Sequence, residues 1–243
     1  LNILGVRKGW VAITKVDVVN DEEWIDLIEL EISEYLLNYK FDIFSCSRIN
    51  NISGDGVEFL KQDILSYSKS QKLIEPSKYF RMNVDRSFIK KGFGTIVTGT
   101  VAEGKAAIGD LVEVLPNSVF SKIRGLQSHG KNTQRIYKGD RAAVNLLNMK
   151  LKNFHRGSVL ATPSTIKNTK KIVARINMVK QTKWVLKHNQ RLRLHFGTDE
   201  VLGRIFFKNK KKIKKNQKGN CVLFLESEIP VSLDDKFVIR SYS

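Results

Sequence analysis

The sequence predicts an α/β unit followed by two β domains, each a barrel or a sandwich, and two observations support this order. The first 75 residues alternate strand-like and helix-like apolar patterns, whereas the chain beyond Pro76 consists of short β-rich runs separated by Gly and Asp. Residues 1–75 hold 8 Lys and Arg against 13 Asp and Glu, a net charge of −5, and residues 76–243 hold 34 against 11, a net charge of +23. Such asymmetry is typical of an acidic module joined to one that binds a polyanion.

The first part reads as strand, helix, strand, helix. A short apolar run predicts a buried strand, Asp21 can cap the helix that follows, and apolar residues then recur at helical spacing. A second strand, a loop at 48–55 and a second helix-like pattern complete the set. The expected strands and helices are, in order, 10–14, 22–39, 42–45 and 56–69. This order is typical of the end of a doubly wound α/β domain.

The remainder contains two sets of short strands without a simple sequence repeat. The first set is expected at 79–89, 94–104, 110–116, 121–127, 141–147 and 157–163. The second set is expected at 171–179, 190–197, 200–207, 221–227 and 235–241. We therefore predict three domains, with bounds 1–75, 76–166 and 167–243.

Composition limits the class of protein. The formal charge of +18 over 243 residues draws polyanions, above all nucleic acid. Only Cys46 and Cys221 are present, so neither a disulfide framework nor a CxxC metal site is expected, and a reducing cytoplasm fits best. No apolar run approaches the roughly 18 residues of a membrane span, so no membrane partner is expected.

One candidate site lies where two strands of the first part are expected to end. The carboxylate of Asp17 can accept the ring NH and the exocyclic amine of guanine, with the stem of Lys15 along the base. Ser45, Cys46 and Ser47, expected to end the next strand, could offer backbone NH groups to the guanine oxygen. The alternative is a solvated Lys beside a helix-initiating Asp.

Three further segments carry charge. In 85–100 the glycines fit barrel turn chemistry, but Asp85 followed by Arg86 needs another explanation, since strand alternation should point one of them inward. Arg156 lies in a basic turn that by itself predicts no site. The run 208–218 holds seven lysines; it is either a solvated hairpin or a surface along a phosphate backbone. Neither a metal site nor a catalytic Ser-His-Asp or Cys-His group is expected.

Together, the segments 1–17, 85–100, 153–161 and 194–205 resemble selenocysteine-specific elongation factors of the SelB type. DRSF-x-x-KG-x-GT-x-VTGT is the most specific part. The resemblance implies that the α/β part is a remnant, the C-terminal part of a P-loop GTPase domain, followed by two barrels of the translational GTPase type. It also implies GTP as cofactor, and selenocysteyl-tRNA and the ribosome as partners.

The same resemblance implies that segments lie outside this chain. The P-loop, the switch segments and the Mg²⁺ site are expected upstream, so we expect no GTP hydrolysis by this chain alone. Winged helices that bind the selenocysteine insertion element of messenger RNA are expected downstream. Because Leu1 stands where an initiator Met is usual, we expect a fragment.

The resemblance also implies roles for individual residues. Guanine recognition is expected from Thr14, Lys15 and Asp17, with Ser45, Cys46 and Ser47 as the companion loop, in which Cys46 replaces the usual Ala. The pocket for the selenocysteyl group is expected from Asp85, Arg86 and Arg156. Two alternatives stay open: a non-catalytic RNA-binding β-barrel protein, and another translational GTPase such as EF-Tu or an initiation factor gamma subunit. The paired Asp85-Arg86 and Arg156 disfavour the latter.

Overall fold

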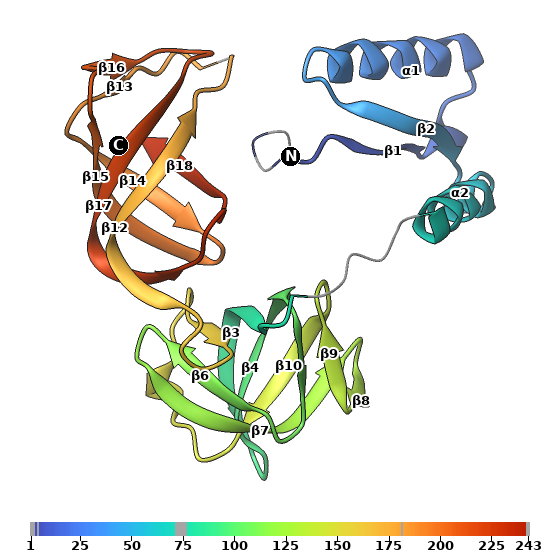
Figure 1. Ribbon diagram of the computed structural model, residues 1–243. Helices are drawn as coiled ribbons and strands as arrows, with labels where there is room; N and C mark the ends of the chain where they lie inside the picture. The colour runs from blue at the N-terminus through green and yellow to red at the C-terminus, as the bar shows by residue number, and fades with distance from the viewer. Residues whose placement is uncertain (1–2, 4, 71–76, 181, 242–243) are drawn as a thin grey trace. The chain divides into compact units, whose positions relative to one another are not determined.

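The computed structural model describes residues 3, 5–70, 77–180 and 182–241 and divides the chain into two compact units, Leu1–Ile74 and Glu75–Ser243 (Figure 1). The expected junction at Pro76 lies outside the described residues. The expected fold class, an α/β part followed by two β-barrels, is confirmed.

The first unit is a parallel strand pair with a helix on each side (Figure 1). Its elements are β1 (Lys8–Thr14), a 3-10 turn (Val16–Val18), α1 (Glu22–Leu37), β2 (Asp42–Ile49) and α2 (Val57–Ser70). The Asp21 side chain accepts a hydrogen bond from the backbone NH of Trp24 at 3.1 Å, so the expected helix cap is confirmed. Trp10, Phe44 and Tyr67 pack together and join the strand pair to α2.

The first barrel is a closed sheet. Its strands are β3 (Arg81–Lys90), β4 (Gly94–Glu103), β5 (Lys105–Ala107), β6 (Leu111–Leu115), β7 (Val119–Ser128), β8 (Lys131–Thr133), β9 (Arg135–Tyr137), β10 (Arg141–Leu146) and β11 (Val159–Ala161). The strand order is β10-β4-β3-β11-β6-β7-β8, and a further pairing of β10 with β7 closes the circle. Inward-facing Met82, Val97, Val114, Val144 and Leu160 fill the interior, as strand alternation requires.

The second barrel contains a five-stranded antiparallel sheet. Its strands are β12 (Lys167–Asn177), β13 (Leu186–Lys187), β14 (Gln190–Phe196), β15 (Asp199–Phe207), β16 (Lys212–Ile213), β17 (Lys218–Val231) and β18 (Phe237–Ser241). The order in the large sheet is β12-β17-β15-β14-β18, and β13 pairs separately with β16. Leu192, Leu194, Ile205 and Leu223 are fully buried in its core.

Candidate functional site

The end of β1 leads into a tight turn that exposes the TKVD side chains. Lys15 adopts a left-handed backbone conformation (φ 63°, ψ 34°), and the NH of Val18 donates to its carbonyl at 3.1 Å. Thr14, Lys15 and Asp17 are all exposed. A carboxylate and an ammonium group therefore reach solvent beyond the carboxyl end of a parallel strand, the position at which α/β sheets bind ligands.

The expected position of Ser45, Cys46 and Ser47 at a strand end is wrong. β2 continues to Ile49, and Cys46 and Ser47 lie opposite Val11 and Ala12 within the parallel ladder. An irregularity in the register near Gly9 and Val11 accompanies this extension. These three residues therefore lie inside the sheet and away from its carboxyl edge.

Contacts with the helices explain why this polar segment continues as a strand. The Ser45 hydroxyl donates to Asp63 Oδ2 of α2 at 2.6 Å, and the Trp10 ring NH reaches the same oxygen at 2.8 Å. The Cys46 thiol lies beside Glu29 of α1; burial, and then its hydrogen bond to Glu29, raise its pKa to about 11. The segment thus anchors both helices to the sheet.

The loop that does lie at the carboxyl end of β2 begins at Asn50, because Ile49 pairs with Thr14. The Asn50 side-chain oxygen accepts from the backbone NH groups of Ile52 at 2.8 Å and Ser53 at 3.1 Å. Gly56 has φ +80°, and a Cβ there would lie 1.9 Å from the Arg48 carbonyl oxygen, so only glycine fits. Gly54, Asp55 and Gly56 directly precede α2, so the expected end of this loop at residue 55 agrees closely with the structure, and only its expected start at residue 48 was too early.

Asp85 lies at an irregularity in the pairing of β3 with β4 and is held by two partners. The register shifts between Val84 and Arg86, as in a β-bulge that places an unpaired residue in the strand. The Thr98 hydroxyl donates to Asp85 Oδ1 at 2.8 Å, and Arg141 Nη1 lies 2.7 Å from Oδ2. Sequence reasoning missed Arg141, which belongs to a strand far along the chain and meets Asp85 only when β10 pairs with β4.

Arg86 and Arg156 come from adjoining backbone segments. β11 pairs with β3, and just beyond this ladder the NH of Val84 donates to the carbonyl of Ser158 at 2.9 Å. Both guanidinium-bearing residues are exposed, and Arg156 Nε donates to the carbonyl of Thr198 at 3.2 Å. Within the described residues, the side chains of Asp85, Arg86 and Arg156 form no hydrogen bond or ion pair with one another. The fold thus brings the segments of Arg86 and Arg156 together, whereas Asp85 forms its ion pair with Arg141.

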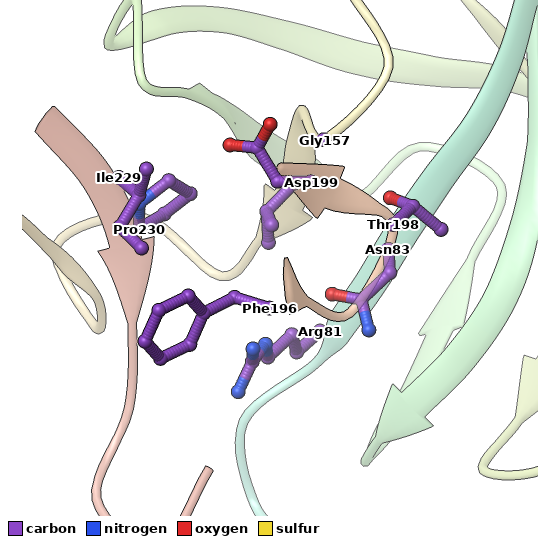
Figure 2. Close-up of a pocket in the computed structure, with 9 residues that line it drawn as sticks. Arg81, Asn83, Gly157, Phe196, Thr198, Asp199, Ile229 and Pro230 are labelled. Atoms are coloured by element: carbon purple, nitrogen blue, oxygen red, sulfur yellow. The ribbon is translucent and has the colours of Figure 1, made fainter. Parts of the chain in front are cut away.

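The turn that carries Arg156 rests on the second barrel, and Figure 2 shows Gly157 of this turn beside Asp199. Gly157 has φ +99°, and a Cβ there would lie 2.3 Å from the Asp199 side chain. The Thr198 hydroxyl donates to the carbonyl of Val84 at 2.8 Å. Burial raises the pKa of Asp199, and the nearby His155 acts in the opposite direction.

The cavity at this contact is small. Its volume is about 10 Å³, and its lining includes Arg81, Asn83, Phe196, Ile229 and Pro230 (Figure 2). Such a space holds at most about one water molecule. We therefore assign it to the packing of the two barrels and not to a ligand.

Metal-binding groups and membrane-spanning helices are both absent from the described part of the chain. No group of three or more His, Cys, Asp or Glu side chains that could hold a metal ion occurs among these residues. No helix among them is long and apolar enough to cross a membrane.

Comparison with known proteins gives concordant results. A family model described as Elongation factor Tu domain 2 matches residues 94–161. A protein of Desulfomicrobium baculatum named selenocysteine-specific elongation factor is 33% identical over 242 residues, covering 100% of this chain and 38% of the relative. The chain spans well under two thirds of the length of that curated relative.

Solved structures agree with this similarity. The crystal structure of a bacterial selenocysteine-specific elongation factor, EF-Sec, matches with a TM-score of 0.82 at 28% identity, covering 98% of this chain and 38% of that one. SelB of Methanococcus maripaludis in complex with the GTP analogue GppNHp matches with a TM-score of 0.79 at 27% identity, covering 96% of this chain and 54% of that one. By sequence along its whole length and by fold, the chain is a homologue of the selenocysteine-specific elongation factors and corresponds to a part of those proteins.

Proposed function

We propose that the chain is part of a translation elongation factor that binds GTP and selenocysteyl-tRNA. This factor delivers the selenocysteyl-tRNA to the ribosome at recoded UGA codons. The observation that carries the proposal is the meeting of the Arg86 and Arg156 segments across β3 and β11. Each of the three predicted domains then has its own role, in which 1–75 binds guanine, 76–166 binds the aminoacyl group and 167–243 contacts tRNA. Hydrolysis of GTP and binding of the messenger element belong to the whole protein in this proposal.

The chemistry of the aminoacyl group supports a pocket of this charge. A selenol ionises more readily than a thiol, whose ordinary pKa is about 8.5, and so arrives as an anion at neutral pH. Arg86 and Arg156 would attract that anion, whereas a neutral seryl group would gain no such charge interaction with either guanidinium group. Because Asp85 binds Thr98 and Arg141, its carboxylate does not neutralise this pair.

The strand-end geometry supports guanine as the base that the first unit binds. The exposed carboxylate of Asp17 can accept two hydrogen bonds from guanine, and the stem of Lys15 can lie along the ring. Because β2 ends at Ile49, we assign the companion role to the backbone of the loop that starts at Asn50 in place of Ser45, Cys46 and Ser47.

Binding of charged tRNAs to the full-length factor tests the proposed pocket. In the wild-type factor, selenocysteyl-tRNA should bind more tightly than seryl-tRNA. Arg86→Ala or Arg156→Ala should lose roughly tenfold to a hundredfold of that preference, because a hydrogen bond to a charged group contributes about 1.5–3 kcal/mol. Affinities for selenocysteyl-, cysteinyl- and seryl-tRNA would be measured by competition.

Arg124→Ala is the matched control, since Arg124 is an exposed arginine of the same barrel on β7. This control should keep the wild-type preference. If Arg86→Ala and Arg156→Ala left the affinity ratio of selenocysteyl- to seryl-tRNA unchanged, the pocket assignment would be wrong.

A further inference from the structure

A dense group of cations lies at one end of the second barrel, away from the residues discussed so far. We call it the lysine tip and define it as Lys208, Lys210, Lys211, Lys212, Lys214, Lys215 and Lys218, which run from the end of β15 through β16 to the start of β17. All seven side chains are exposed. β13 and β16, which carry part of this end, lie together in Figure 1.

The backbone of the lysine tip is fixed to the barrel core. Leu186 of β13 and Ile213 of β16 lie opposite each other, and both are fully buried. Ile213 also packs against Gly219, where a Cβ would lie 2.5 Å from its terminal carbon. The lysines that flank Ile213 are therefore held outward on an ordered ribbon.

The same pairing sets like charges against each other. Lys187 lies directly opposite Lys212 in the two-residue ladder of β13 and β16. Like charges in such a position destabilise a sheet. A bound anion between the two ammonium groups would remove that repulsion.

Three lysines of the lysine tip and one arginine line an adjoining groove. Arg175 of β12 and Lys208, Lys210 and Lys218 line a cavity of about 410 Å³, together with Asn209 and Asn220. Concave surfaces of one charge sign focus the electrostatic field. The groove thus offers guanidinium, ammonium and amide donors in a space larger than a free phosphate needs.

Acidic side chains do not offset this charge. The sequence contains no Asp or Glu between Glu200 and Glu226. In the part of the chain that the structure describes, none of the seven lysines forms an ion pair. The positive charge of the lysine tip is therefore available to attract an anionic ligand from solvent.

From this charge and shape we propose that the groove and lysine tip bind the phosphate backbone of structured RNA without reading its bases. The seven lysines of the lysine tip outnumber the arginine and the two asparagines that line the groove, and flexible lysines act as point charges toward phosphates. None of the exposed large hydrophobic residues falls within 208–218, so this surface lacks the apolar side chains that insert into a membrane. The choice of RNA rests on the proposed function, in which 167–243 contacts tRNA. The inference deepens that function by naming a surface for the contact that is independent of the aminoacyl group.

The test uses the 243-residue chain and a labelled RNA duplex of mixed sequence, which carries no amino acid. Binding is measured by fluorescence anisotropy over a series of salt concentrations. Lys208→Gln, Lys210→Gln and Lys218→Gln combined should weaken binding about tenfold or more at low salt, and reduce the slope of log K against log salt by about 2–3, since each phosphate contact contributes roughly 0.7–0.9. Arginine at the same three positions should keep wild-type binding, and a second duplex of different sequence should bind equally well.

The matched control removes the same charge elsewhere. Lys105→Gln, Lys131→Gln and Lys138→Gln combined change three exposed lysines of the first barrel and should leave most of the affinity intact. Equal losses in both triple variants would overturn the proposal, as would wild-type binding by the groove variant. Groove-dependent binding to phosphatidylserine vesicles without binding to RNA would also overturn it. Loss of RNA binding without loss of preference for selenocysteyl-tRNA in the full-length factor separates this site from the proposed aminoacyl pocket.

Discussion

At the scale of single residues, a largely buried ion pair joins the two barrels. Arg81 of β3 makes two parallel hydrogen bonds to Asp235, Nη1 to Oδ1 at 2.6 Å and Nη2 to Oδ2 at 2.8 Å. The Arg81 side chain is only 10% exposed. The pair joins the two barrels, and Arg81 lines the same small cavity as Gly157, the residue after Arg156, so the pair bears on the geometry of the candidate aminoacyl pocket.

Loss of the charge on Asp235 should therefore be costly. Asp235→Asn keeps the shape of the side chain but leaves a buried guanidinium without its counter-charge, and we expect the free energy of unfolding to fall by about 3 kcal/mol. Glu226→Gln is the matched control, because the Arg191 and Glu226 side chains are 40% and 47% exposed and such pairs contribute about 0–1 kcal/mol. Urea denaturation of both variants gives the loss in the free energy of unfolding relative to the wild type. Equal losses in the two variants would contradict the argument that burial makes the Arg81–Asp235 pair more stabilising.

At the scale of secondary structure elements, the close approach of β3 and β4 shapes the segment around Asp85 and Arg86. Gly99 of β4 lies opposite Val84, next to the irregularity, and a Cβ on it would lie 2.0 Å from the Asn83 carbonyl oxygen. Real Cβ atoms do not approach a backbone oxygen so closely, so any side chain would push the strands apart. Steric exclusion of a Cβ thus explains why residue 99 of the VTGT motif is a glycine.

Gly99→Ala should destabilise the first barrel by about 1–3 kcal/mol, the range for overpacked interiors. Gly125→Ala on β7 of the same barrel is the control, since its Cβ would meet only the Asn145 Cβ at 3.8 Å, an ordinary contact. The urea midpoint of the two variants is the measurement. We also expect Gly99→Ala to weaken selenocysteyl-tRNA binding in the full-length factor; a Gly99→Ala variant as stable as Gly125→Ala would contradict the steric argument.

The same scale shows what the sequence can and cannot predict. Strands and helices with regular apolar spacing, such as α1 and β4, were predictable because their burial pattern is local. The end of β2 was not, because Arg48 is polar and is held in the strand by ion pairs with Asp26 and Glu29 of α1. Likewise the Asp85 partner Arg141 depends on the pairing of β10 with β4, which no local window reveals.

At the scale of the whole molecule, the two compact units differ in how much core each contains. In the first unit only Ile25 and Ile49 are buried hydrophobic residues among those described, and α2 buries none. Trp24, Leu27 and Leu30 on α1 are each more than half exposed. The second unit holds three clusters of buried side chains among those described, a large one in each barrel and a small one around Leu115 and Val159.

This contrast predicts different behaviour of the two units when each is produced alone. Residues 75–243 should unfold cooperatively, because two apolar cores and the Arg81–Asp235 pair hold the barrels together. Residues 1–74 should give no cooperative transition, since a two-stranded sheet with so little burial is marginal in water. Thermal melts followed by near-UV circular dichroism and proton NMR dispersion measure both. A sharp transition and a dispersed spectrum for 1–74 would mean that the strand pair and its two helices supply enough stability by themselves, contrary to the burial argument.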